Sequence, residues 1–304
     1  MGNPLIGAIE AGGTKFVLAL FDENGAMRAE ARLPTRTAAE TMPQVVRFFR
    51  EAAAAHGALA GIGVASFGPL DVAPASAGYG TITTTPKPGW AGASFIEWLA
   101  PLGVPLKVDT DVNGAALGEA LKGAGQGCRT LAYTTVGTGI GTGVVCDGRP
   151  LAGFSHYESG HIRVPHDRTR DPFPGHCPFH GDCVEGLAAG PAIKARFGQS
   201  LDAMADPSDA VELVAGYLAD LAANLVLLHA PDRLVFGGGV MKAPGLLAAL
   251  RRETEARLAG YIAHARLDPG LERYIVAPGL GDLAGITGAV ELGRLAIAQA
   301  RAAA

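Results

Sequence analysis

The sequence predicts an α/β protein built from two similar lobes, and two glycine-rich hairpins are the main evidence. Near the N-terminus, the apolar runs "LIGAIEAGG" and "FVLALFD" are typical of strands joined through Gly12 and Gly13. Farther along, "TLAYTTVGTGIGTGVVCDG" has the same strand–turn–strand pattern, again punctuated by glycines. Because the second hairpin restarts the pattern of the first, we expect a second α/β lobe rather than a continuation of one sheet.

The segments after the first hairpin follow a helix–strand order. The run "AAETMPQVVRFFREAAAAHGA" places Val45, Val46, Phe49 and Ala53 on one helix face, and this helix is expected to end at Gly57. The strand "GIGVASFGP" follows, and "PLKVDTDVNGAALGEALKGAG" predicts a short strand that runs into another helix. This alternation indicates a sheet covered by helices.

The second half has fewer regular signals. We expect a loop-rich segment from about 150 to 185, a long helix from about Asp209 to His229, and a strand at "RLVFGGGV". A C-terminal helix is predicted from about Gly285 to Ala302. No low-complexity linker separates the lobes.

The composition excludes several classes of protein. Of 304 residues, 48% are hydrophobic, and the net charge of −4 comes without any run of like charge, so we expect no nucleic-acid partner. Glu10 and Lys15 interrupt the first apolar stretch, which argues against a secretory leader and for a cytoplasmic location. The most apolar later run, "LADLAANLVLLHAP", is shorter than the roughly 20 apolar residues of a membrane span, so no membrane partner is expected.

Glycines in both hairpin turns are candidates for phosphate binding. In "EAGGTK", Gly12 and Gly13 let backbone amides approach a phosphate, while Thr14 and Lys15 add a hydroxyl and a charge. A Gly-Gly hairpin turn without a ligand explains the same residues. In "TTVGTGIGTG", residues 134–143, glycines alternate with threonines more densely than a purely structural strand tolerates. The second turn therefore favours phosphate contact, although neither turn matches a Walker or Rossmann motif.

Asp111 lies where a predicted strand ends and a helix begins. Open α/β sheets bind ligands at the carboxyl ends of their strands, and a carboxylate there can accept a proton from a hydroxyl group. The alternative is that Asp111 caps the helix N-terminus, which is a frequent role for Asp or Thr. From the residues alone, both interpretations stay open.

The stretch "HCPFHGDCVEG" predicts a metal site. Cys177, His180 and Cys183 are soft ligands at zinc-binding spacing, and His161 can complete a tetrahedral set. A site with four protein ligands is structural, and it would pin the loop from about 161 to 185.

Other histidines and cysteines give weaker signals. His166 and His176 compete with His161 for the fourth ligand position. Nothing around Cys128 or Cys146 is typical of an activated thiolate, and the cysteine spacings do not indicate a disulfide framework.

Polar side chains beside the metal loop suit a polyol. The run "YESGH" brings Glu158 and His161 to one turn, and Glu185 follows the cysteines. Glutamates are more often plain surface charges. A metal bound by His161 favours the polyol interpretation, because it would hold His161 and Glu185 in place.

Taken together, these motifs resemble the ROK sugar kinases, which belong to the superfamily of hexokinase, actin and Hsp70-like ATPases. "EAGGTK" resembles the first phosphate motif, "DTDVNGAALGE" the catalytic segment, "TTVGTGIGTGVV" the second phosphate motif, "ESGH" with "CVEG" the zinc region, and "LVFGGGVM" the nucleotide-binding turn. The resemblance implies a two-lobed actin-like ATPase (ribonuclease H-like) fold with a zinc-pinned loop. One lobe would comprise residues 1–118 and the C-terminal helix, about 285–304, and the other would comprise residues 119–284.

Within the family, "EAGGTK", "TITTTPKPGW" and "CPFHGDCVEGLAAGPAI" are most similar to the bacterial fructokinases. This resemblance implies ATP-dependent phosphorylation of D-fructose at the 6-hydroxyl, with Asp111 as the catalytic base, Mg²⁺ as a cofactor, structural Zn²⁺ and a homodimer. Glu10 replaces the more usual Asp, and Thr110 replaces the Asn of the family's glucokinases. Both departures argue against glucose specificity. The alternatives are a kinase for glucose, mannose or an amino sugar, and a non-catalytic sugar sensor.

The resemblance also implies a role for each candidate residue. Substrate contacts are expected from Asn113, Glu158, His161, Glu185, Thr85 and Gly68. Contacts with ATP and its phosphates are expected from Glu10, Gly12, Gly13, Thr14, Lys15, Gly137, Thr138, Gly139, Gly237, Gly238 and Gly239. The expected zinc ligands are His161, Cys177, His180 and Cys183.

Overall fold

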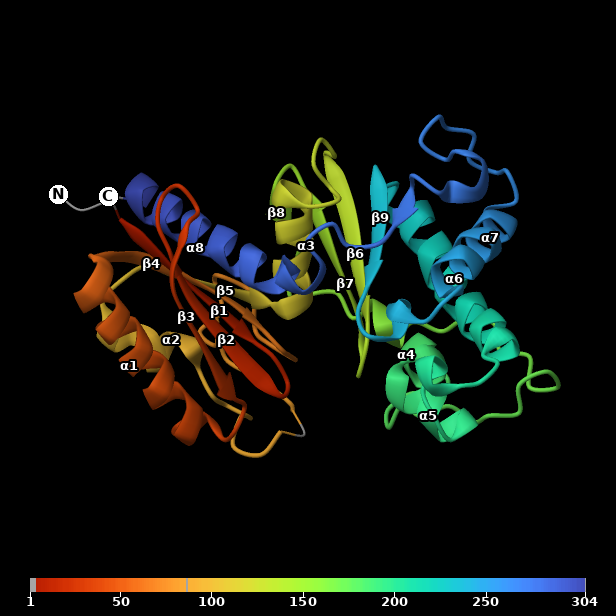
Figure 1. The fold of residues 1–304 in the computed structure, drawn as a ribbon, viewed down its shortest axis with the longest axis horizontal. Coiled ribbons are helices and arrows are strands. Elements are labelled where there is room, and N and C mark those ends of the chain that lie inside the picture. Colours follow the sequence, from red (N-terminus) through yellow and green to blue (C-terminus); the bar gives the residue numbers. More distant parts are fainter. Residues whose placement is uncertain (1–3, 86, 304) are drawn as a thin grey trace. The chain divides into compact units, whose positions relative to one another are not determined.

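The structure, a computed structural model, describes residues 4–85 and 87–303. The chain divides into two compact units (Figure 1). Unit 1 contains the chain up to Lys122, the segment Pro150–His156 and the chain from Asp282 onward. Unit 2 contains Gly123–Arg149 and Tyr157–Gly281.

Residues 119–122 and 150–156, which we expected in the second lobe, belong to unit 1. The first group completes helix α3 (Asp111–Lys122). The second group contacts unit 1 through His156, whose ring accepts a hydrogen bond from the backbone amide of Leu70 at 3.3 Å.

Unit 1 is built on a five-stranded sheet in the order β3-β2-β1-β4-β5. The strands are β1 (Leu5–Ala11), β2 (Lys15–Phe21), β3 (Met27–Pro34), β4 (Leu59–Ser66) and β5 (Leu106–Thr110). The first three strands are antiparallel neighbours, whereas β4 and β5 run parallel to β1. The predicted N-terminal hairpin is therefore confirmed, and the edge strand β3, which we did not predict, extends it.

Helices cover both faces of this sheet. They are α1 (Ala38–His56), α2 (Phe95–Leu99), α3 and α8 (Ala284–Ala303). On one face, a Cβ atom added to Gly7 of β1 would lie 2.8 Å from the Phe49 ring of α1. On the other face, a Cβ atom on Gly63 of β4 would lie 1.9 Å from the Ala289 carbonyl oxygen of α8. Glycines in the strands therefore make room for both layers of helices.

Helices α3 and α8 are in direct backbone contact. A Cβ atom on Gly288 of α8 would lie 1.7 Å from the carbonyl oxygen of Gly114 in α3, and one on Gly118 would lie 2.5 Å from the carbonyl oxygen of Ala284. Because no side chain fits between them, the C-terminal helix supports the helix that begins with Asp111.

Unit 2 also contains a five-stranded sheet, in the order β10-β9-β6-β7-β8. Its strands are β6 (Thr130–Val136), β7 (Ile140–Cys146), β8 (Arg149–Pro150), β9 (Arg233–Gly237) and β10 (Ile275–Val276). β6 and β7 are antiparallel, whereas β9 runs parallel to β6 and β10 parallel to β9. The second predicted hairpin and the strand at "RLVFGGGV" are therefore confirmed.

The helices of unit 2 include several that we did not predict. They are α4 (Val184–Ala188), α5 (Gly190–Phe197), α6 (Ser208–His229) and α7 (Leu246–Leu258). Short 3-10 helices in the two units lie at Ala100–Leu102, Ser159–His161, Leu201–Ala203, Val240–Lys242, Pro269–Leu271 and Gly281–Leu283. Only α6 was expected, since the other helices of this unit are short or have weakly segregated faces.

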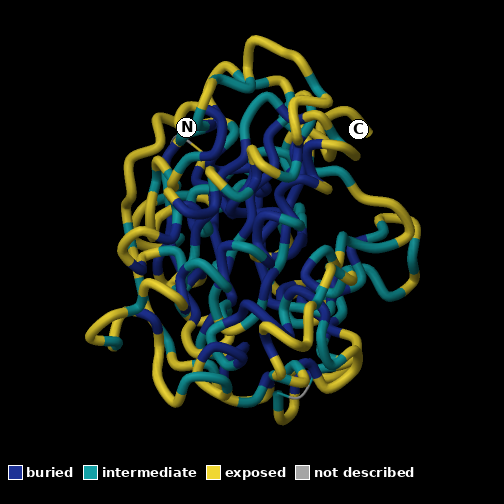
Figure 2. Tube along the Cα trace, turned by 90° about the vertical axis from the view of Figure 1, so that its right-hand side faces the viewer, coloured by how far each residue is buried: buried dark blue, intermediate teal, exposed yellow. Residues whose placement is uncertain are grey.

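Buried residues gather along the central strands, whereas the connecting loops are exposed (Figure 2). In the part of the chain that the structure describes, α6 is the one helix long and apolar enough to cross a membrane. Of the apolar stretch of α6, 61% is buried inside the protein, as in a core helix. The helix packs against α7 and α4.

Candidate functional site

The first glycine turn joins β1 to β2 and is held from several sides. The Gly12 amide donates to the Lys15 carbonyl oxygen at 2.9 Å, and the Thr35 hydroxyl donates to the Gly12 carbonyl at 2.7 Å. A Cβ atom on Gly12 would lie 2.8 Å from the Lys15 carbonyl oxygen, so the turn requires glycine there. The Lys87 ammonium donates to the Gly13 carbonyl at 2.7 Å, which places a cation beside the turn.

Glu10 lies at the end of β1, with its carboxylate against the first turn of α8. A Cβ atom on Gly285 would lie 2.6 Å from a Glu10 carboxylate oxygen. Burial raises the pKa of Glu10, the nearby Lys15 opposes this shift, and the negative charges of Asp111 and Asp282 add to it. Burial is the main cause of the raised pKa, and the charges of Asp111 and Asp282 act in the same direction, so a divalent cation would relieve the repulsion among these carboxylates.

Asp111 is the first residue of α3, but it is not the residue that caps the helix. The Thr110 hydroxyl accepts a hydrogen bond from the Asn113 amide at 3.1 Å, which is the N-cap interaction. Asp111 is exposed, and one of its carboxylate oxygens accepts from the Val112 amide at 2.8 Å. Thr110, and not Asp111, therefore caps the N-terminus of α3.

Asn113 does not lie beside Asp111 at the surface. It is 1% exposed, and its side-chain amide donates to a carboxylate oxygen of Asp109 at 2.7 Å. Burial raises the pKa of Asp109, while this hydrogen bond opposes the shift. The Asn113 side chain therefore connects α3 to β5, and the sugar contact expected from Asn113 stays a prediction.

Gly68 and Thr85 lie in loops of unit 1. Gly68 follows β4, and a Cβ atom on it would lie 3.6 Å from Nε2 of His156. The Thr85 hydroxyl accepts from the Lys87 amide at 3.3 Å. Neither His156 nor Lys87 was among the predicted site residues. Lys87 was quoted within "TITTTPKPGW", whereas no pattern pointed to His156.

The second glycine turn joins β6 to β7. The Gly137 amide donates to the Gly139 carbonyl at 2.9 Å, the Gly190 amide donates to the Gly137 carbonyl at 2.8 Å, and Thr138 is exposed at the tip. The Ile140 amide donates to Oε2 of Glu185 at 2.9 Å. A negative charge therefore lies at the base of this turn.

The glycines that follow β9 lie beside the same turn. Gly238 has a φ of 94°, and a Cβ atom on it would lie 2.3 Å from the Val136 carbonyl oxygen at the end of β6. Only glycine fits this position, because both the left-handed backbone and the close approach exclude a side chain. Gly237 packs against the Tyr133 hydroxyl, whereas nothing lies within 4 Å of a Cβ atom on Gly239.

Four of the predicted ligands form one cluster in unit 2. The ligand atoms of His161, Cys177, His180 and Cys183 all lie within 4.8 Å of one another. Nδ1 of His161 is 3.6 Å from each cysteine sulfur, and Nδ1 of His180 is 3.6 Å from the Cys177 sulfur. Tetrahedral zinc, with bonds of about 2.3 Å to sulfur and 2.0–2.1 Å to nitrogen, separates these atoms by roughly 3.6 Å. The donor set fits zinc in both chemistry and spacing.

Neither of the competing histidines belongs to the cluster. Nδ1 of His166 lies 3.2 Å from a carboxylate oxygen of Asp182, and its Nε2 lies 2.9 Å from the Asp171 carbonyl oxygen. His176 is exposed and outside the cluster.

Local backbone structure holds the two cysteines. Cys177 and Gly181 exchange backbone hydrogen bonds of 3.1 and 2.9 Å, and Cys183 is the N-cap residue of α4. Burial raises the pKa of the Cys183 thiol to about 11, so a metal that binds there must displace the thiol proton.

His161 connects the cluster to the second glycine turn. Its Nδ1 faces the cysteines, while its Nε2 lies 3.9 Å from Oε1 of Glu185, whose other oxygen accepts from Ile140. Glu158 is exposed at the start of the 3-10 helix, and its carbonyl accepts from the His161 amide at 3.0 Å. The structure thus brings the His161 ring and the Glu185 carboxylate together beside the cysteine–histidine cluster, and the Glu158 backbone joins them through His161.

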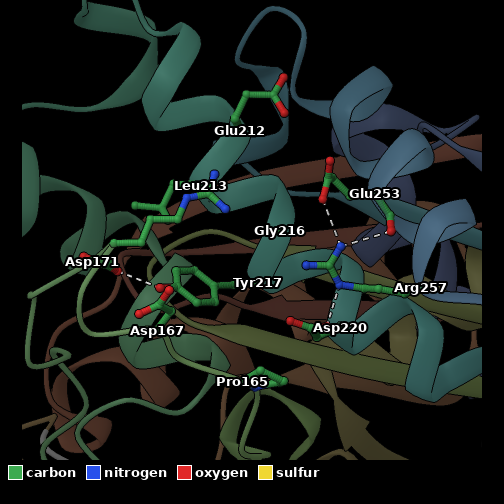
Figure 3. A pocket seen from close by; sticks show the side chains of 11 residues that line it. Pro165, Asp167, Asp171, Glu212, Leu213, Gly216, Tyr217, Asp220, Glu253 and Arg257 are labelled. Carbon is green, nitrogen blue, oxygen red and sulfur yellow. Dashed lines mark hydrogen bonds and ion pairs between the residues drawn. The ribbon is translucent and has the colours of Figure 1, made fainter.

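A separate pocket of about 240 Å³ lies within unit 2, between α6, α7 and the loop near residue 170 (Figure 3). At its edge, the Tyr217 hydroxyl donates to Asp171 at 2.7 Å. Arg257 donates to Asp220 at 2.5 Å and to Glu253 at 3.0 Å. None of the predicted site residues lines this pocket, and the lining carboxylate of Glu212 pairs with Arg252, which is not part of the lining.

Both units repeat one plan, in which an antiparallel hairpin with a glycine turn joins parallel strands between helices. This duplicated plan defines the actin-like ATPase class of fold. Within that class the chain belongs to the ROK family, whose sequence profile matches residues 6–295.

Individual relatives cover nearly the whole chain. The fructokinase of Zymomonas mobilis subsp. mobilis is 46% identical over 293 residues, which cover 95% of this chain and 96% of the relative. The ROK hexokinase from Thermus thermophilus matches with a TM-score of 0.80 and 28% identity, over 97% of this chain and 99% of that one. A ROK family glucokinase from Streptomyces griseus, in complex with glucose and AMPPNP, matches with a TM-score of 0.69 and 25% identity, over 97% and 100% of the chains.

Proposed function

We propose that the protein transfers the γ-phosphoryl group of ATP to the 6-hydroxyl of D-fructose, giving fructose 6-phosphate and ADP. The observation that carries the proposal is the full-length similarity to the Zymomonas fructokinase. The exposed carboxylate of Asp111 supplies the required chemistry, since Thr110 performs the capping function instead.

Asp111 acts as the general base. As the sugar oxygen forms its bond to phosphorus, the bond between phosphorus and the β–γ bridging oxygen breaks, and Asp111 accepts the hydroxyl proton. The backbone contact between α3 and α8 keeps this carboxylate in position, because the glycines leave α3 little freedom to shift. The hydrogen bond from the Asn113 side chain to Asp109 also holds the start of α3 against β5.

Glycine turns and charges hold the nucleotide. Amides of Gly12, Gly13 and Thr14, with the Lys15 ammonium, approach the phosphates in unit 1, and Thr138 with its flanking glycines does so in unit 2. The adenine lies near Gly237, Gly238 and Gly239. Glu10, Asp111 and Asp282 are the carboxylates suited to Mg²⁺, since their charges act on one another. Bound magnesium supplies positive charge to the phosphate oxygens.

The sugar hydroxyls bind to Glu158, His161 and Glu185 of unit 2, and Asn113, Thr85 and Gly68 are the residues of unit 1 assigned to the same substrate. Oε2 of Glu185 is engaged by Ile140, so Oε1 is the oxygen left for a hydroxyl. Zinc on His161, Cys177, His180 and Cys183 is structural. Bound through Nδ1, the His161 ring would be held in one orientation, and its Nε2 would remain for the sugar.

A coupled assay of ADP release tests the reaction. Fructose, glucose, mannose and N-acetylmannosamine would be compared as acceptors, and we expect fructose to be preferred. Asp111→Asn should lower turnover by roughly two to four orders of magnitude while sugar binding is retained. Asp202→Asn removes an exposed carboxylate elsewhere and should leave turnover unchanged. Near-normal turnover in Asp111→Asn would refute the assignment of Asp111 as the general base. Preference for an aldohexose would refute fructose as the acceptor.

The assembly and location are part of the same proposal. The family resemblance implies a homodimer, which light scattering after gel filtration would test. ATP as the donor is consistent with a cytoplasmic location.

A further inference from the structure

Lys87 reaches the first glycine turn from a loop 74 positions away in the sequence. Its ammonium donates to the Gly13 carbonyl at 2.7 Å and lies 5.0 Å from the centre of the Phe67 ring. The aromatic face stabilises a cation at this place. A cation is therefore held beside the turn that we propose to bind phosphate.

The surroundings fix the Lys87 side chain. Trp90, which is 1% exposed, anchors the loop by donating to the Arg36 carbonyl at 2.5 Å and by packing edge-on against Phe67 at 5.3 Å. A Cβ atom on Gly13 would lie 2.8 Å from the Lys87 ammonium, so the absence of a side chain at Gly13 leaves the space that the ammonium uses.

The Lys87 charge is not cancelled by the hydrogen bond that holds it, because the acceptor is a neutral carbonyl. Lys15 carries the other ammonium at this turn. Its charge interacts with a carboxylate, since it lowers the pKa of Glu10. Phosphoryl transfer spreads negative charge over the oxygens of the transferred group, and a preorganised cation stabilises that charge. Lys87 has the position and the charge to supply this stabilisation.

We infer that Lys87 is a catalytic residue whose ammonium contacts the transferred phosphoryl group and later the phosphate of the sugar product. The inference rests on the proposed phosphotransfer to a sugar. In the reaction, Lys87 leaves the Gly13 carbonyl for a phosphoryl oxygen and keeps its proton throughout. The hydroxyl proton goes to Asp111, and ADP leaves with the bridging oxygen.

A purely structural role for Lys87 makes different predictions. If the side chain only tied its loop to the turn, its loss would loosen Thr85, whose hydroxyl accepts from the Lys87 amide. The affinity for sugar and for sugar phosphate would then fall together, and the protein would lose thermal stability. A phosphoryl contact affects turnover and the phosphorylated product selectively.

The test compares Lys87→Met and Lys87→Arg with Lys122→Met, which removes an exposed ammonium at the end of α3. Lys87→Met should lower kcat by roughly 100- to 1000-fold, the loss typical of removing one transition-state donor. The KM for the sugar should change less than about threefold. Lys87→Arg should retain a higher kcat than Lys87→Met does. Lys122→Met should have the kcat and KM of the wild type.

Binding measurements complete the test. By calorimetry, Lys87→Met should bind fructose 6-phosphate at least about tenfold more weakly than the wild type does, the loss typical of a charged hydrogen bond, with unchanged affinity for fructose. Equal losses for both ligands, or kcat equal to that of Lys122→Met, would overturn the inference. If the wild type prefers another sugar, the proposed acceptor is wrong. The same variants are then measured with that sugar and its phosphate, so that the role of Lys87 is still tested. A wild type without turnover on any sugar overturns both.

Discussion

Removal of the metal from the cysteine–histidine cluster should destabilise the protein by an amount that the loop length sets. His161 and Cys183 are 22 positions apart, so a shared metal closes a loop of that length. Treated as a cross-link, the closure removes 2.1 + 1.5R ln 22, about 11 cal/mol/K, or about 3.4 kcal/mol at 25 °C, from the entropy of the unfolded chain. At roughly 2 °C per kcal/mol for a chain of this size, Tm should fall by about 7 °C.

The assay would follow zinc content by elemental analysis, Tm by calorimetry and fructose affinity, before and after chelation. We expect about one zinc per chain, because the cluster offers four ligands. Chelation should remove the zinc, lower Tm and weaken fructose binding together. Cys177→Ser should have the same three effects. Cys146→Ser, which changes a thiol outside the cluster, should retain all three. Zinc-free protein at purification, or zinc loss without a change in Tm, would refute the reasoning.

Three other changes test the packing and the charges. Gly238→Ala should cost roughly 2–5 kcal/mol in urea denaturation, since a φ of 94° and a Cβ atom 2.3 Å from a carbonyl oxygen combine strain with overlap. Gly127→Ala, with a φ of 78° and open space, should cost only about 1–2 kcal/mol, and equal costs would contradict this account. Tyr217→Phe removes a donor from a buried carboxylate and should cost about 1–3 kcal/mol, whereas Tyr261→Phe, on a side chain 85% exposed, should have no effect. Burial lowers the pKa of His229 below 6.5, so the unfolded chain binds the proton more tightly. Stability should therefore fall as pH falls from 6.5 through the lower folded pKa, and an unchanged pH profile of Tm in His229→Asn would argue against this.

Local signals in the sequence predicted much of the fold. Both hairpins follow from apolar runs around glycines, and the helix that ends at His56 follows from the spacing of Val45 and Phe49 before Gly57. The cysteine–histidine cluster was also predictable, because the spacing of these residues limits which side chains can meet. The short helices α4 and α5 carry no such periodicity.

The details of the site depend on contacts that the sequence does not display. Asp111 and Thr110 are neighbours with similar capping propensity, and only the helix start distinguishes the cap from the exposed carboxylate. The burial of Asn113 depends on its bond to Asp109 in a neighbouring element. Lys87 meets its turn only through folding over 74 positions, beyond any local pattern.

The glycine contact between α3 and α8 has a consequence for biosynthesis. Unit 1 begins with the first strand, yet its helix α8 ends at Ala303, and the backbone of Gly114 packs directly on Gly288. Protein segments fold as they leave the ribosome, with N-terminal units first. Here the helix that carries Asp111 lacks its support until translation has passed the end of α8. A nascent chain should therefore bury its early strands yet remain inactive, and activity should arise only once α8 has left the ribosome and packed against α3.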